Sequence, residues 1–256
     1  MELSEKISIL PSILNLKRQV VGVKIIKNKE NYDFIEAKQI KNKITYCYMI
    51  KLATYGKHFK AKAENFLCDG ASKALGLMTV PDNVISGQVY ESLGLYENRE
   101  VAKEAQRDVK YIKEKNYGVE IFSLNNFPAK EFDVAIIIDS SYKIMRLMQG
   151  YSYYYGVNKN ISFSGNQGIC SEATAVPYIN DDVNASMLCS GTRFFAKWNE
   201  DDIAFGIPYS KMSKVIDGVI NTINPTESDE KKQEIIKKLK DKDINLNIEL
   251  GKNYYI

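Results

Sequence analysis

The sequence predicts a single α/β or α+β domain, in which two halves share a strand–helix–strand–helix order. Two runs rich in β-branched residues, 20–26 and 133–139, predict strands, and the second is apolar enough for a central strand buried on both faces. Each run is followed by a helical pattern, which is typical of mixed folds. With 45% hydrophobic and 26% charged residues, the composition excludes a disordered or coiled-coil chain. A chain of 256 residues can bury about 70–75% of its unfolded surface, so it needs no disulfide or metal to fold.

The first half continues with three short elements. A helix is expected over 44–55, and the alternation of apolar and polar residues over 59–63 predicts a half-exposed strand. Small residues over 68–77 then indicate a short helix that ends near Gly76. The charged segment 99–114 predicts a surface helix.

In the second half, Ser140 or Ser141 can cap a helix after the central strand. Its apolar stripe consists of Ile144, Leu147, Met148, Tyr151, Tyr154 and Tyr155. Residues 161–163 predict another strand, and 170–176 predict a short helix that Pro177 stops. A further helix starts at Pro208.

The C-terminal tail has a different character. Residues 226–243 carry six basic and six acidic residues and open with Thr226–Asp229, a capping-box pattern. The sequence therefore predicts one domain over 1–225, with a possible boundary between its halves near 115–130. A charged helical extension follows over 226–256.

The two halves suggest an internal duplication. In each, a strand and a helix ending in Tyr-Gly precede a short strand and a cysteine that opens a small helix. On this hypothesis Cys68 and Cys170 occupy equivalent places and face each other. The alternative is that two unrelated helix–turn–strand units resemble each other by chance.

Four cysteines carry most of the chemical information: Cys47, Cys68, Cys170 and Cys189. None belongs to a Cys-x-x-Cys pair, so the usual zinc-ribbon and ferredoxin spacings are absent. Glycines and small residues surround Cys68, Cys170 and Cys189, and these let the backbone approach a ligand closely. A helix N-terminus favours the thiolate, the form that binds soft metals. The alternative is that they are inert core residues, since free cysteine is often buried.

Several stretches around these cysteines resemble an uncharacterised prokaryotic family, the domain-of-unknown-function family 169, or ArCR family. They are Asn65–Leu77, Ser86–Gly87, Gly94–Tyr96, Tyr46–Cys47, Met145–Gln149, Cys170 before Ala175–Pro177, Leu188–Arg193 and Gly206–Pro208. The resemblance covers roughly residues 10–223. It implies cysteines at the four positions, and it implies no particular activity.

Other residues offer alternative sites. Ser190, Thr192 and Arg193, together with Ser140, could bind a small anion through hydroxyls, backbone N–H groups and a guanidinium. His58, the single histidine, is expected to be a partly exposed strand residue rather than a general base. No G-x-G-x-x-G or Walker A motif supports nucleotide binding.

We therefore expect a cytoplasmic protein with a cysteine-ligated metal site. An iron–sulfur cluster held by Cys47, Cys68, Cys170 and Cys189 is the first choice and zinc the second. The cluster would serve electron transfer or bind a small substrate, with a redox protein or small molecule as partner, in an anaerobe. The alternatives are a metal-free module for an anionic metabolite and a thiol redox enzyme or sensor.

Charge and hydropathy limit the other partners. The net charge of +3 is too small to indicate nucleic acid binding. No apolar run is long enough for a membrane helix, and the N-terminus lacks the apolar core of a signal peptide. A homo-oligomer is compatible with the sequence, which does not decide whether the protein is an enzyme.

Overall fold

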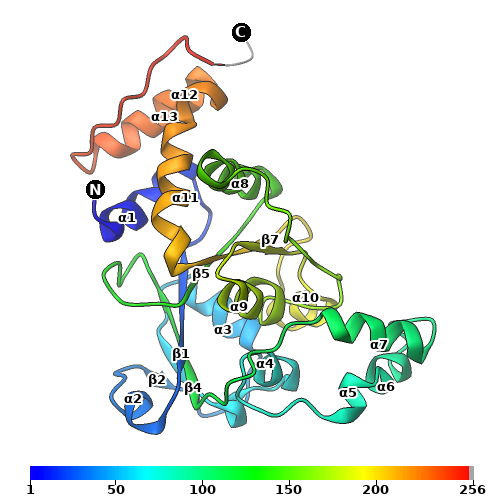
Figure 1. Ribbon diagram of the computed structural model, residues 1–256. Helices are drawn as coiled ribbons and strands as arrows, with labels where there is room; N and C mark the ends of the chain where they lie inside the picture. The colour runs from blue at the N-terminus through cyan, green and yellow to red at the C-terminus, as the bar shows by residue number, and fades with distance from the viewer. Residues whose placement is uncertain (254–256) are drawn as a thin grey trace.

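The structure, a computed structural model, describes residues 1–253, which form a seven-stranded mixed sheet with helices on both faces (Figure 1). The strands are β1 (Val21–Ile26), β2 (Lys38–Gln39), β3 (Phe59–Ala61), β4 (Gly118–Ser123), β5 (Val134–Asp139), β6 (Asn184–Ser186) and β7 (Ile203–Pro208). Their order is β2-β3-β4-β1-β5-β7-β6, and each neighbouring pair is antiparallel except β2–β3. The predicted mixed fold is confirmed, and β5 is buried along its whole length.

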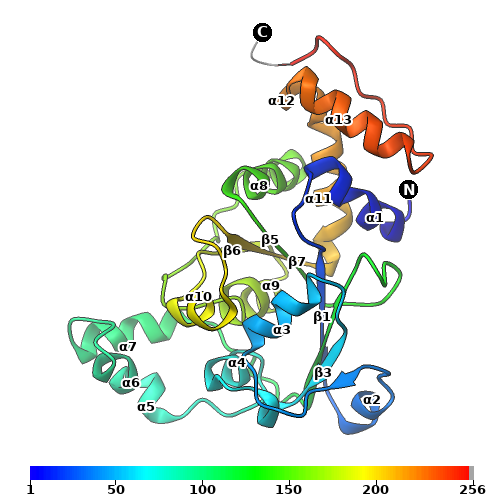
Figure 2. The ribbon, with the colours of Figure 1, turned by 180° about the vertical axis from the view of Figure 1, so that it is seen from behind.

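Two helical layers cover the sheet (Figures 1 and 2). One holds α1 (Leu3–Leu14), α8 (Ser141–Tyr155), α11 (Tyr209–Asn221) and α13 (Asp229–Lys240). The other holds α3 (Tyr46–Ala53), α4 (Asp69–Ala74), the π-helix η2 (Ser171–Ala175), α9 (Val176–Asn180) and α10 (Ser190–Ala196). Outside the layers lie α2 (Lys29–Asp33), η1 (Ala63–Asn65), α5 (Asp82–Ile85), α6 (Gln88–Ser92), α7 (Arg99–Asp108) and α12 (Ile223–Thr226). Within residues 1–253, none of the helices is both long and apolar enough to cross a membrane.

Six of the seven strands form two three-stranded units with the same register, and β2 lies outside them at the edge of the sheet. β1 pairs with β4 over six residues, the first residue of β1 lying opposite the last of β4, and β5 pairs with β7 in the same way. β3 then pairs with the second to fourth residues of β4, and β6 pairs with the second to fourth residues of β7. Two unrelated units would have no reason to share both registers, so the agreement supports an internal duplication.

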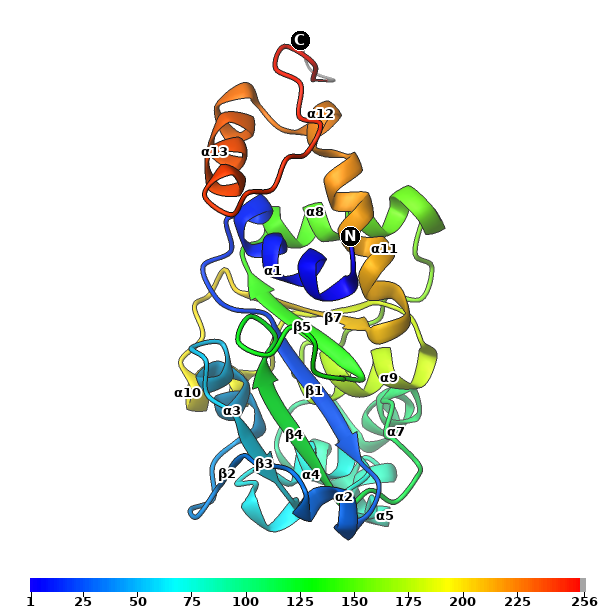
Figure 3. The same ribbon diagram turned by 90° about the vertical axis from the view of Figure 1, so that its left-hand side faces the viewer.

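A pseudo-twofold axis relates the two units. β1 and β5 are antiparallel neighbours, with Gly22 opposite Ala135, each the second residue of its strand (Figure 3). An axis perpendicular to the sheet at this pair exchanges β1 with β5, β4 with β7 and β3 with β6. Because such a rotation keeps each face of the sheet on its own side, equivalent helices lie in the same layer.

The duplication differs from the predicted one in its pairing of cysteines. The helix before β3 is α3, which begins next to Cys47, and the helical segment before β6 is η2–α9, which begins next to Cys170. After β3 comes Cys68 at α4, and after β6 comes Cys189 at α10. Cys47 is thus equivalent to Cys170 and Cys68 to Cys189, so the predicted equivalence of Cys68 with Cys170 was wrong.

Other differences have local causes. Residues 161–163 form no strand, because the Ser162 N–H binds the Asn184 side chain, at 2.9 Å, instead of a sheet partner. Pro177 does not stop the helix after Cys170; it is the second residue of α9, which continues directly from η2 to Asn180. Of the predicted apolar stripe on α8, Tyr154 is exposed.

The C-terminal helix α13 packs against α1. Ile235 and Leu239 belong to the same core cluster as α1, α8 and α11. Residues 254–256 of the predicted extension lie outside the described part of the chain, and the boundary between 225 and 226 stays a prediction.

Candidate functional site

The four cysteines lie at the N-terminal ends of four helical segments. Cys47 is the second residue of α3, Cys68 and Cys189 are the N-cap residues of α4 and α10, and Cys170 directly precedes η2. Free N–H groups and the helix dipole give such ends a partial positive charge, which favours a thiolate or another anion.

These helical ends come together on one face of the sheet. α3 packs against α10, and α4 packs against η2, as the pseudo-twofold axis requires. Burial raises the pKa of the Cys170 thiol well above its ordinary value, and negative charge on Cys189, Cys68 and Cys47 raises it further. Burial also raises the pKa of Cys47, and Cys189 and Cys68 add to that shift. Each half therefore contributes two thiols to one shared region.

Threonine hydroxyls contact two of the thiols. The Cys47 Sγ donates to Thr45 Oγ1 at 3.2 Å, and Cys189 Sγ lies 3.1 Å from Thr192 Oγ1. Thr192 also donates its backbone N–H to Cys189 at 3.3 Å, and it lies close enough to Cys47 to lower the pKa of that thiol, although burial raises that pKa more. Gly168 leaves room for this contact, because a Cβ there would lie 2.7 Å from Thr192 Oγ1 and 2.9 Å from Cys189 Sγ. Thr192 of the second half therefore bonds Cys189 and lies near Cys47 of the first half.

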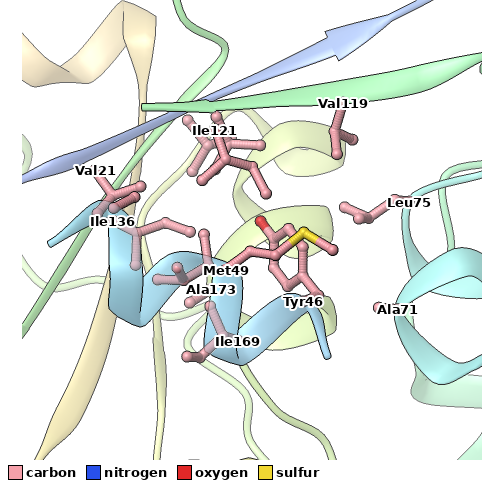
Figure 4. Close-up of a cluster of buried hydrophobic side chains, with 14 of the residues drawn as sticks. Val21, Tyr46, Met49, Ala71, Leu75, Val119, Ile121, Ile136, Ile169 and Ala173 are labelled. Carbon is pink, nitrogen blue, oxygen red and sulfur yellow. The ribbon is translucent and has the colours of Figure 1, made fainter. Parts of the chain in front are cut away.

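Next to the cysteines, the two halves share a hydrophobic core. Tyr46 and Ile169 each precede a cysteine and lie together under the sheet (Figure 4). The Tyr46 hydroxyl is 3.0 Å from the hydroxyl of Thr174 in η2, a buried hydrogen bond between the halves. This packing fixes the first turns of α3 and η2 and hence the positions of Cys47 and Cys170.

The donor set suits a soft metal or a cluster, although no coordination sphere is preformed. Within residues 1–253, no group of three or more His, Cys, Asp or Glu side chains has an arrangement that could hold a metal ion. To ligate a metal, the sulfurs of Cys47 and Cys189 would have to exchange their threonine contacts for metal bonds. The four thiols nevertheless form an all-sulfur donor set, which is typical of iron–sulfur and structural zinc sites.

Comparison with known proteins identifies the family. The sequence profile of the domain-of-unknown-function family 169, described as uncharacterised ArCR, matches residues 9–218. The chain belongs to this family. An uncharacterized protein of Methanocaldococcus jannaschii, MJ0308, is 25% identical over 224 residues, which cover 85% of this chain and 94% of that protein. No solved structure matches the chain. The match spans both halves of the sheet, so the duplicated strands and all four cysteines lie within the part that the ArCR family shares.

A buried carboxyl group supports the Cys170 segment, and the sequence analysis missed it. Glu172 accepts hydrogen bonds from Ser186 Oγ at 2.6 Å and from the Ser164 N–H at 2.7 Å. Burial raises its pKa, which the hydrogen bonds only partly offset. Glu172 thus ties the loop before Cys170 to β6. The residues next to Glu172 in the sequence are small and uncharged, so no sequence pattern indicates the role of Glu172.

The residues predicted to bind an anion do not converge. The Arg193 guanidinium donates to the carbonyls of Met187, Asn199 and Asp202 and holds its own loop together. Ser140 caps α8, on the opposite side of the sheet from α10. Thr192 is the member of the set that contacts cysteines, and Ser190 is the first residue of α10, next to Cys189.

His58 lies apart from the cysteines, near the start of β3. Its Nε2 is 2.7 Å from Glu120 Oε1, and Lys130 Nζ is 3.0 Å from the same oxygen. Burial alone would raise the pKa of Glu120, but the hydrogen bonds from His58 and Lys130 outweigh it and lower that pKa. His58 therefore supports a buried carboxylate of β4, in agreement with the expected structural role.

Replacing His58 should make stability depend less on pH. A carboxylate with a lowered pKa stabilises the fold at neutral pH, and this contribution is lost as the pH falls through its folded pKa. We expect His58→Ala to lower the free energy of unfolding by about 2 kcal/mol at pH 7, and by less toward pH 3. Urea unfolding at both pH values measures this, with His58→Gln, which keeps an N–H donor, as the control. An equal loss at both pH values would contradict the assignment.

Proposed function

We propose that the protein binds an iron–sulfur cluster through Cys47, Cys68, Cys170 and Cys189, on the pseudo-twofold axis between its halves. The cluster would serve electron transfer or hold a small substrate. The observation that carries the proposal is the placement of four thiols, two from each half, at four helical N-termini on one face of the sheet. We further propose the reducing cytoplasm of an anaerobe as its location, since its cysteines are free.

The chemistry of the donors supports a cluster more than a catalytic zinc ion. Catalytic zinc usually has histidine ligands, and His58 is engaged with Glu120 away from the cysteines. Thiolates carry negative charge, which the four helical N-termini would partly balance. When bound, a cluster would supply one-electron chemistry or an open iron position.

Proton binding opposes metal binding at this site. Ligating thiols must be deprotonated, and the pKa values of Cys47 and Cys170 are raised in the metal-free fold. Metal uptake should therefore release protons and weaken as the pH falls. The same raised pKa values keep the two thiols protonated and unreactive when no metal is present.

Anaerobic purification tests the proposal directly. We expect a brown protein with iron and acid-labile sulfide in similar amounts. Cys189→Ala should lose iron, while Arg193→Ala, a matched control from the same helix, should retain it, because a guanidinium has no lone pair for a metal. A colourless, metal-free protein would overturn the proposal, and zinc without sulfide would replace the cluster with a zinc site. If Arg193→Ala rather than Cys189→Ala abolishes binding of a small anion, the metal-free binding module is correct.

A further inference from the structure

The two halves are not equivalent in their contacts at the cysteines. The hydroxyl of Thr192, the third residue after Cys189, forms a hydrogen bond with Cys189, and that of Thr45 accepts one from Cys47. The residue at the same distance from Cys68 is Ala71, which has no hydroxyl to offer. Cys68 is also the exposed cysteine, whereas the other three are partly buried. Threonine hydroxyls thus bond the thiols of Cys47 and Cys189, whereas the Cys68–Cys170 side, where Cys68 is exposed, is open.

A segment found only in the first half lies against this open side. It carries α5, α6 and α7 and separates α4 from β4, whereas a short loop joins α10 to β7 (Figure 1). The Tyr90 hydroxyl accepts from the Gln167 side chain at 3.4 Å, and the carbonyl of Lys110, just after α7, accepts from Ser171 Oγ at 3.3 Å, so the segment lies against the residues on either side of Cys170.

The same segment holds two buried polar atoms that have no partner. Tyr96 packs edge-to-face on Tyr90, with ring centroids 6.3 Å apart, and Gln106 Oε1 accepts the Tyr111 hydroxyl at 2.8 Å. Within residues 1–253, Tyr96 Oη and Gln106 Nε2 have no hydrogen-bond partner, although Gln106 is only 5% exposed. Leaving such a group unpaired costs about 1–3 kcal/mol, so buried polar atoms are normally satisfied. Both groups can donate, and both lack an acceptor.

We propose that a small carboxylate or another oxyanion binds on the Cys68–Cys170 side of the site, with its oxygens accepting from Tyr96 and Gln106. Oxyanions supply the acceptors that these two groups lack, and hydrogen bonds to a charged oxygen are stronger than neutral ones. The inference builds on the proposed function, because it places this ligand beside the cluster on the side where the hydroxyl of Thr192 has no counterpart.

Thermal unfolding of the protein, as purified without oxygen, tests this inference. Sodium acetate, oxalate and phosphate serve as probes, each against sodium chloride at the same ionic strength. We expect at least one probe to raise the melting temperature, because a ligand that binds only the folded state stabilises it. Tyr96→Phe should melt no lower than the wild type without probe, since it removes an unpaired hydroxyl, and should bind the probe at least tenfold more weakly. Tyr153→Phe, on the exposed side of α8, is the matched control and should behave like the wild type.

The outcomes separate this inference from the proposed function. A lower melting temperature for Tyr96→Phe without probe would show that the hydroxyl is already satisfied, for instance by an internal water, and would overturn the inference. An equal response of wild type and Tyr96→Phe, or no response to any probe, would also overturn it. Metal analysis of the same samples decides the cluster independently. If the wild-type protein contains no metal but a probe raises its melting temperature more than that of Tyr96→Phe, the proposed cluster would be rejected and the proposed anion site kept.

Discussion

Replacing Gly206 with alanine should lower the free energy of unfolding by about 3 kcal/mol and displace the helical turn that carries Cys170. Gly206 lies in β7, directly beneath η2. A Cβ at this position would overlap the Ala173 carbonyl oxygen and lie 2.7 Å from Pro177 Cγ. Neither group can move without shifting η2, because Ala173 belongs to the backbone of η2 and Pro177 is the second residue of α9, which continues it. Urea unfolding measures the loss.

A second glycine near the cysteines provides the control. Gly191 lies in α10, and a Cβ there would meet only Cys189 Sγ, at 3.9 Å. Gly191→Ala should therefore raise stability slightly, since alanine is the better helix former. If Gly206→Ala unfolds at the same urea concentration as Gly191→Ala, η2 does not rest on β7 as described. Under the proposed function, Gly206→Ala should also lose iron before it loses its fold.

The second large effect is expected at a buried ion pair. Arg146 in α8 is fully buried, and its Nε lies 2.6 Å from Glu227 Oε1. The guanidinium also donates to Gln149, Thr222 and the Val219 carbonyl. Removing one partner of a buried pair leaves a charge without compensation, which costs about 3–5 kcal/mol. We expect Arg146→Ala to fall near the lower end of that range, because the Tyr142 hydroxyl still bonds Glu227.

Two variants test the cause of this loss. Arg99→Ala breaks an exposed pair with Glu91, whose atoms are 3.0 Å apart, and should cost less than about 1 kcal/mol. The double variant Arg146→Met, Glu227→Met should be more stable than Arg146→Ala, because it leaves no charge buried alone. A double variant no more stable than Arg146→Ala would show that the loss comes from packing rather than charge.

Much of the fold could be predicted because its strongest elements have clear local patterns. Apolar runs in the sequence predict β1 and β5, and apolar stripes at helical spacing predict α8 and α11. Tertiary contacts reinforce these local patterns. β4 and β7 were missed for physical reasons. Glu120, a charge satisfied by distant partners, interrupts the apolar pattern of β4, and Gly206, a residue that weakens strands, interrupts β7.

The candidate site could be predicted in its residues and not in its geometry. The four cysteines were selected from the sequence, three of them for the glycines and small residues around them, but their pairing depends on which strands are neighbours. The sequence does contain a signal for the correct pairing, because Leu67–Gly70 and Leu188–Gly191 share the pattern Leu-Cys-x-Gly. The inserted segment after α4 and the extra helix α8 before η2 shift the spacing between equivalent residues. Matching by distance along the chain therefore paired Cys68 with the wrong partner.

Because the two equivalent halves are joined in one chain, the residues around the four cysteines can evolve separately in each half. In an assembly of two identical subunits, every substitution occurs on both sides of the axis, so the two sides must remain alike. In a fused chain each side changes by itself. Thr192 bonds Cys189 on one side, while its counterpart Ala71 has no hydroxyl on the other. Phe59 is a buried core residue, while its counterpart Asn184 forms hydrogen bonds that hold the loop at Ser162. A fused chain can therefore hold a site whose two sides differ, whereas two identical subunits related by a symmetry axis cannot.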